Sequence, residues 1–206
     1  MNFILAKKVG MSQEFQKDGT VVPVTVLEAG PCTVTQVKTA DKDGYTAVQL
    51  AFGKRKTKRI NKAQLGHFKG LADFRYVREF RVADVAGYER GKTVTVEGFK
   101  PGDIIAVQGV SKGRGTAGVI KRHHFTRGPE THGSRHHRHP GSMGSRFPQH
   151  TPRGKKLPGH LGDATVTTTN MEVVHVDPAN NILAIKGSVP GARNALVRVL
   201  GGSDAK

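Results

Sequence analysis

The chain has 206 residues, enough for one well-filled core or two small ones, and it carries a formal net charge of +17. Thirty-three Lys and Arg residues against sixteen acids favour a nucleic-acid partner, because neutralising phosphates releases counterions. The single Cys32 excludes an internal disulfide and a cysteine-based zinc site. The apolar runs are too short for a signal peptide or for the roughly 20 residues that span a bilayer. We therefore expect a cytoplasmic protein with no membrane partner.

The first third of the chain is predicted to be β-strands. Residues 21–27 are β-branched and apolar, and residues 33–37 (TVTQV) alternate after a Gly-Pro turn. Residues 45–52 alternate again after Asp43-Gly44, a pair typical of hairpin turns. Short strands about ten residues apart, separated by turn signals, predict a barrel or a sandwich.

A basic run, KRKTKR, follows at residues 54–59. It is either a solvated loop or a phosphate contact surface, and the charge of the whole chain favours the second. Asn61 is predicted to cap a short helix through about residue 69, which Gly70 ends. Residues 75–81 alternate like a further strand. We expect residues from about 54 to 92 to form a small α-containing insertion on the barrel.

Strand patterns resume in the second half of the chain. They cover residues 93–96, 104–107, 165–169, 171–176, 182–186 and 195–200. Because strand signals lie on both sides of a long basic segment, the simplest architecture is one β domain from residues 1–110 and 163–206. Residues 111–162 would leave this domain and return to it.

Residues 111–162 carry eleven Lys and Arg but only one acid, Glu130, and they hold eight of the ten histidines. From 123 to 160 only four side chains are apolar in the usual sense, so this segment cannot offset its own conformational entropy by burial. We predict that a polyanion orders this segment, and that it is disordered and largely unprotected from amide exchange in the free protein.

Three patterns in this segment resemble catalytic or cofactor sites. Residues 113–118 match G-x-G-x-x-G, but the long helix and the later acid of a dinucleotide site are missing. Four histidines between residues 132 and 139 could chelate a metal, although interleaved arginines oppose a dication and phosphate contact is the other interpretation. Ser134 or Ser142 could form a triad with a histidine and Glu130 only on paper. We predict no enzyme activity, cofactor, metal or small-molecule substrate.

Four stretches together resemble a known family. They are ILAKKVGMSQEF, SKGRGTAGVIKR, HRHPGSMG…GKKLPGHLG and NILAIKGSVPGA, and they occur in order along nearly the whole chain. They resemble the bacterial large-subunit (50S) ribosomal protein L-three family. The resemblance implies a six-stranded β-barrel of the translation-protein type with a long central extension. It also implies a structural protein that binds 23S ribosomal RNA near its 3′ end, helps to nucleate 50S assembly, and meets neighbouring large-subunit proteins.

In this family the tip of the extension lies near the peptidyl-transferase centre, and the resemblance places the tip here at around residues 144–152. Residues 145–153 read SRFPQHTPR, which is one residue shorter than the usual family text. Some members carry a methylated glutamine in the tip, but aligning Phe147-Pro148 on the family's Thr-Pro puts Arg146 at that site. We therefore do not carry the modification over to Gln149.

The charge pattern and the resemblance together give the residues expected to bind RNA. They are Lys54, Arg55, Lys56, Lys58, Arg59, Lys112, Gly113, Arg114, Gly115, Gly118, Lys121, Arg122, His132, Arg135, His136, Arg138, His139, Pro140, Gly141, Gly144, Arg146, Arg153, Lys155 and Lys156. The alternative is a general nucleic-acid-binding barrel of the OB or cold-shock kind, which would present aromatic stacking residues on a sheet face. Few aromatics lie on the predicted strands, and the charge lies in a loop.

Overall fold

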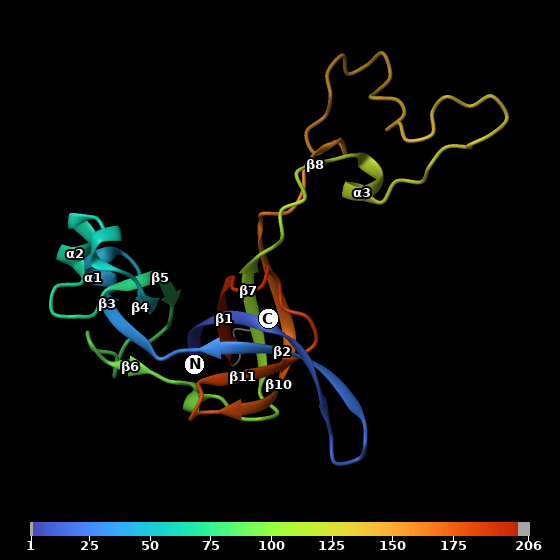
Figure 1. The fold of residues 1–206 in the computed structure, drawn as a ribbon. Coiled ribbons are helices and arrows are strands. Elements are labelled where there is room, and N and C mark those ends of the chain that lie inside the picture. Colours follow the sequence, from blue (N-terminus) through green and yellow to red (C-terminus); the bar gives the residue numbers. More distant parts are fainter. Residues whose placement is uncertain (1, 202–206) are drawn as a thin grey trace. The chain divides into compact units, whose positions relative to one another are not determined.

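A computed structural model describes residues 2–201. It is mainly β-structure with a few short helices (Figure 1). The chain divides into two compact units. One combines the residues up to Val110 with those from Thr165 onward, and the other is Ser111–Ala164.

The first unit holds a closed barrel of six antiparallel strands, which confirms the fold class predicted from the sequence (Figure 1). Around the barrel the order is β1-β12-β7-β10-β11-β2, so each strand has two neighbours and no edge is left unpaired. The strands are β1 (Phe3–Phe15), β2 (Val21–Ala29), β7 (Ile104–Val110), β10 (Thr165–Asp177), β11 (Ile182–Lys186) and β12 (Leu196–Gly201).

Alternation along the strands fills the barrel. On β12, Val197 and Val199 are buried, whereas Leu196, Arg198 and Leu200 between them are only half-buried. Successive side chains of a strand point to opposite faces, so the first pair lies inside the barrel and the other three lie outside. The outward residues of β12 are therefore available for contacts beyond the barrel.

β10 is one long strand where the sequence predicted two. Its register against β7 shifts between Thr168 and Met171, and Asn170 has a positive φ of 57°. A bulge of this kind interrupts the alternation without ending the strand, and it bends the strand as a closed barrel requires. The sequence pattern showed the interruption but not the continuous pairing.

A second, four-stranded sheet in the same unit has the order β5-β4-β3-β6. It is larger than the insertion predicted at about 54–92, because the strands at Cys32–Lys38 and Ala47–Lys54 pair within it and not with the barrel. Periodicity identified them as strands but contained no information on their partners. The strands are β3 (Cys32–Lys38), β4 (Ala47–Lys54), β5 (Phe74–Arg81) and β6 (Thr93–Val94).

The sheet packs its apolar face on the barrel. Phe80 of β5 stacks on Phe3 of β1 with ring centroids 4.8 Å apart, and Val34 and Leu50 belong to the same buried core. Aromatic pairs at this separation stabilise a core by about 0.5–1.5 kcal/mol beyond the area that they bury. The barrel and the sheet therefore share one hydrophobic core.

Short helices make the connections around this sheet. They are α1 (Ala40–Asp43), the 3-10 turn η1 (Thr57–Arg59), α2 (Lys62–His67) and the 3-10 turn η2 (Val96–Gly98). The predicted cap of α2 is confirmed, because the Gln64 amide donates to Asn61 Oδ1 over 2.8 Å. Asp43-Gly44 does lie between two antiparallel neighbours, β3 and β4, but the connection is longer than a tight turn, because it contains α1 and ends at Gly44, whose φ is 77°. The predicted strand at 93–96 ends at Val94 and η2 follows it.

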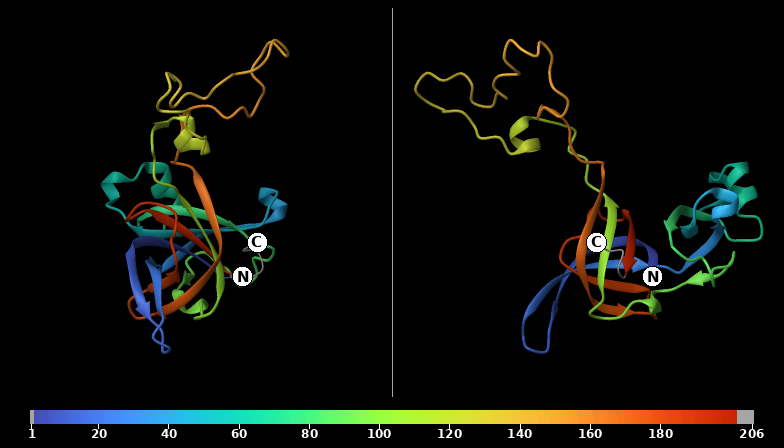
Figure 2. Two further views of the ribbon diagram at one scale, coloured as in Figure 1. Left: turned by 90° about the vertical axis from the view of Figure 1, so that its right-hand side faces the viewer. Right: turned by 180° about the vertical axis from the view of Figure 1, so that it is seen from behind.

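The second unit, Ser111–Ala164, has little regular structure. A two-stranded ladder joins β8 (Thr116–Ala117) to β9 (Gly159–His160), and the short helix α3 (Val119–His123) follows β8. Figure 2 shows the chain between α3 and β9 as an irregular loop. We call residues 111–123 together with 157–164 the root, and residues 124–156 the distal loop.

Candidate nucleic-acid interface

Backbone hydrogen bonds join the two segments of the root. The Ser111 amide donates to the Ala164 carbonyl over 2.9 Å and the Arg114 amide donates to the Leu161 carbonyl over 2.8 Å. The Leu161 amide returns a bond of 3.0 Å to the Gly115 carbonyl. The root is thus an ordered element, which differs from the expectation that the whole of residues 111–162 is unstructured without RNA.

Glycines let the two segments of the root approach each other closely. A side chain at Gly162, whose φ is 79°, would overlap the carbonyl oxygen of Lys112. A side chain at Gly159 would come within 2.7 Å of the Arg122 guanidinium. The glycines predicted from the sequence in this part of the chain are Gly113, Gly115 and Gly118. Gly159 and Gly162, which pack tightly in the root, were not predicted, although both lie in the family-like text GKKLPGHLG.

Arg122 is part of the root's own structure. Its Nη1 donates to the Leu157 carbonyl over 2.7 Å, and the ring Nε2 of His123 lies 3.1 Å from the same oxygen. Part of the hydrogen-bonding capacity of Arg122 is therefore already used to hold the residue Leu157, just before β9, against α3. By contrast the side chains of Lys112, Arg114 and Lys121 are exposed.

The predicted histidine and arginine segment at 132–139 lies in the distal loop and is almost wholly exposed. The rings of His136 and His139 meet edge to face, with centroids 5.2 Å apart. His137 Nδ1 lies 2.8 Å from the Pro129 carbonyl oxygen. Over residues 2–201, the structure gathers no group of three or more His, Cys, Asp or Glu side chains that could hold a metal ion.

The basic side chains of the tip and of the residues just after it lie on the surface. Arg146, Arg153, Lys155 and Lys156 are all exposed, and Phe147 is 67% exposed with the Arg146 guanidinium 5.9 Å above its ring. Within residues 2–201 no other part of the protein buries these side chains. They are free to contact phosphate, and their own packing supplies no order.

The KRKTKR run belongs to the other unit. Its five cations, Lys54, Arg55, Lys56, Lys58 and Arg59, are exposed between the buried residues Phe52 and Ile60. The turn is held by Asp73, whose carbonyl accepts from the Arg55 amide over 3.2 Å and whose carboxylate accepts from the Thr57 hydroxyl. The structure thus keeps the run as a short, anchored surface turn.

A polar network lies beside the edge strand β5. Glu79 accepts from the Tyr45 hydroxyl over 2.9 Å and from Gln49 Nε2 over 3.2 Å, and it pairs with Lys38 Nζ at 3.1 Å. Partial burial alone would raise the pKa of Glu79, but these three donors outweigh it and lower that pKa. The hydrogen bonds from Lys38 to Tyr45 and Glu79 raise the pKa of the lysine. Glu79 is therefore a charged carboxylate whose partners are within the network.

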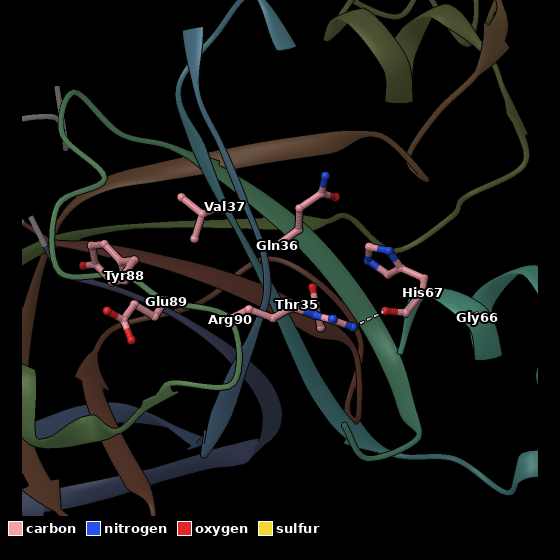
Figure 3. Close-up of a pocket in the computed structure, with 8 residues that line it drawn as sticks. All are labelled: Thr35, Gln36, Val37, Gly66, His67, Tyr88, Glu89 and Arg90. Atoms are coloured by element: carbon pink, nitrogen blue, oxygen red, sulfur yellow. Dashed lines mark hydrogen bonds between the residues drawn. The ribbon is translucent and has the colours of Figure 1, made fainter. Parts of the chain in front are cut away.

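A pocket of about 600 Å³ opens on the second sheet (Figure 3). Its Arg90 donates through Nη2 to the carbonyls of His67, over 2.8 Å, and Lys69, over 3.0 Å, which satisfies the end of α2. Glu89 places a carboxylate in the same pocket. Arg90 already donates to backbone carbonyls and the Glu89 carboxylate repels phosphate, so this pocket fits a phosphate poorly.

Comparison with known proteins decides the family. The sequence model of the family described as Ribosomal protein L3 matches residues 79–181. The chain is 52% identical over 198 residues to the large ribosomal subunit protein uL3 of Desulforudis audaxviator, covering 95% of this chain and 93% of that one. It is 53% identical over 198 residues to the uL3 protein of Lactobacillus delbrueckii subsp. bulgaricus, covering 95% of this chain and 94% of the relative.

The chain belongs to the ribosomal protein L3 family. It is a structural constituent of the large ribosomal subunit and not an enzyme, which confirms the resemblance and the predicted place in the ribosome. As such it is part of a ribonucleoprotein with ribosomal RNA and other ribosomal proteins. Family membership sets aside the OB or cold-shock alternative. Within residues 2–201 no helix has the length and apolar character needed to cross a membrane.

Proposed function

We propose that this chain binds 23S ribosomal RNA directly near the 3′ end of that RNA and helps to nucleate 50S assembly. Residues 111–162 enter the RNA, and their tip extends toward the peptidyl-transferase centre. The observation that carries the proposal is the distal loop, which is long, strongly basic and exposed, and which stands on a root held by its own hydrogen bonds.

The root and the distal loop have different tasks in this mechanism. Ordering a residue costs about 1–2 kcal/mol of backbone entropy, so a loop of this length needs many favourable contacts. The cations of the loop provide them by binding phosphates and releasing counterions. The ladder of the root has already fixed both ends of the loop, which lowers the entropy that RNA must offset.

The KRKTKR turn contributes a second contact. Its five exposed cations sit on a turn that Asp73 anchors, so they reach phosphates with less loss of backbone freedom than the loop does. Recognition of this kind depends on RNA shape and phosphate positions rather than on base edges.

The test compares the full chain with a Lys155→Gln/Lys156→Gln variant in binding 23S ribosomal RNA at several salt concentrations. Each lost phosphate contact is expected to lower the salt slope by about 0.7–0.9, so the double variant should lose roughly 1 to 2. The matched control is Lys17→Gln/Lys42→Gln, which removes two exposed lysines of the other unit. An unchanged slope in the first variant would mean that Lys155 and Lys156 do not touch RNA.

A further inference from the structure

An arginine-lined groove runs along the outer face of the barrel, apart from every basic segment considered above. Two adjoining hollows, of about 540 and 320 Å³, share Gln108 of β7 and Arg198 of β12. The edge strand β5 lines the other side with Arg78 in one hollow and Arg81 in the other. All of these residues belong to the barrel-containing unit.

Arg198 occupies the middle of the groove and is held in place. It projects from the outer face of β12, directly opposite Gln108 on β7, and its Nη1 donates to Gln108 Oε1 over 3.3 Å. Gln108 Nε2 in turn donates to the Thr167 hydroxyl over 3.1 Å, which sets the orientation of the amide. This chain of bonds positions the guanidinium and leaves most of its donors unused.

No carboxylate of residues 2–201 forms an ion pair with Arg78, Arg81 or Arg198. Arg78 Nη1 donates to the Val77 carbonyl over 2.7 Å, and the Arg81 guanidinium lies 5.3 Å from the Tyr45 ring centroid. These contacts leave the positive charges in place without neutralising them.

The surroundings of Arg198 disfavour its positive charge as long as no anion pairs with it. Partial burial lowers its pKa, the charge of Arg78 lowers it further, and only Glu79 acts in the opposite direction. Glu79 lines the same hollow as Arg81, but its carboxylate already pairs with Lys38 and accepts hydrogen bonds from Tyr45 and Gln49. A half-buried charge is stabilised by a paired group of opposite sign, and no carboxylate within residues 2–201 pairs directly with Arg198.

We propose that this groove binds a phosphate of the ribosomal RNA backbone, with Arg198 as the central donor and Arg78 and Arg81 at its sides. The planar fork of a guanidinium matches the oxygens of a phosphodiester, and converging arginines suit a single anionic group. RNA is the occupant because the chain as a whole carries a charge of +17 and a phosphate backbone is the commonest dense anion in a ribonucleoprotein. The inference rests on the proposed function and adds a contact on the barrel to it.

The first test is chemical modification of arginines by phenylglyoxal, read by mass spectrometry. The free protein, its complex with 23S ribosomal RNA alone, and whole 50S particles are compared. We expect Arg78, Arg81 and Arg198 to become at least fivefold less reactive in the complex with RNA alone. Protection only in the 50S particle would assign the groove to a neighbouring protein, and no protection in either would leave it open. Both results overturn the proposal.

The second test measures affinity for 23S ribosomal RNA at several salt concentrations for Arg198→Gln and Arg81→Gln. Each variant should bind about tenfold more weakly and lose about 0.7–0.9 from the salt slope, whereas the exposed-turn control Lys17→Gln should match the unmodified chain. Arg81 is exposed, so its replacement keeps the test informative if Arg198→Gln fails to fold.

The two proposals fail in different ways. Unmodified protein that binds 23S ribosomal RNA while both arginine variants bind equally well overturns the groove alone. Unmodified protein that does not bind this RNA at all overturns the proposed function, and the groove proposal with it.

Discussion

The barrel and the distal loop both display positive charge, but they hold it in opposite ways. In the barrel groove, Arg198 has a fixed place because Gln108 and Thr167 position it on paired strands. In the distal loop, Lys155 and Lys156 are exposed on a segment without regular structure. One chain thus holds some cations in fixed positions on paired strands and leaves others on a segment without regular structure. The predictions below test whether this difference is real.

The largest difference is expected in the contribution to stability. Leu27→Ala in the barrel core should lower the free energy of unfolding by about 2–5 kcal/mol, because Leu27 is fully buried and the truncation leaves a cavity. Phe147→Ala in the distal loop removes a larger side chain that is 67% exposed, and should change stability by less than about 0.5 kcal/mol. Urea unfolding followed by circular dichroism measures both. A comparable loss in the two variants would mean that the loop is packed in the free protein.

An intermediate effect separates the root from the distal loop. Gly162→Ala should abolish amide protection at Arg114 and Leu161, because the new methyl group would overlap the Lys112 carbonyl oxygen. Gly154→Ala is the matched control: its φ is also 79°, but its methyl group would meet nothing within 4 Å. It carries the strain of the left-handed backbone, about 1–2 kcal/mol, without the overlap.

Hydrogen exchange measured by NMR at single amides distinguishes the two glycine variants. Protection at Leu161 should be lost in Gly162→Ala and kept in Gly154→Ala. Equal protection of Leu161 in the two variants would show that backbone strain, and not close packing of the two segments, determines the stability of the root.

The smallest effect concerns the network beside β5. The pKa of Glu79 is lowered in the folded protein, so its contribution to stability is present above the unfolded value near 4.5 and is lost as the pH falls through the folded value. Because the side chain is one-third exposed, this contribution is about 1 kcal/mol or less. Urea unfolding below pH 5 should show a flatter pH dependence in Glu79→Gln than in the unmodified chain. An identical slope would mean that the network does not favour the charged carboxylate.

Sequence reasoning predicted what depends on local pattern. It identified the strands that alternate, the cap at Asn61, and the closed six-stranded barrel through the resemblance. It did not identify the partners of β3 and β4, because alternation is the same in a barrel strand and in a strand of the second sheet. Pairing between distant segments is set by the whole fold.

The candidate interface also has a part that the sequence predicts and a part that it does not. The exposed cations of residues 54–59 and of the distal loop could be read from composition, because runs of charge are visible in one dimension. The groove could not be read in this way, because Arg78 and Arg81 lie on β5 and Arg198 lies on β12, far away in the sequence. Each of them looks, in the sequence alone, like an ordinary outward residue of a strand.

The root is the part for which sequence and structure differ most instructively. Low apolar content predicted that residues 111–162 have no order of their own. Short ladders need little burial, however, when glycine allows backbone hydrogen bonds at close approach, as Gly162 and Gly159 do. We therefore expect RNA to order the distal loop and not the root.

Amide hydrogen exchange on the free protein and on its complex with 23S ribosomal RNA tests that claim most directly. In the free protein we predict protection at Arg114 and Leu161 of the root and none across residues 125–156. In the complex, amides of the distal loop should become protected. Strong protection of the distal loop in the free protein, or none in the complex, would contradict the account that RNA orders it.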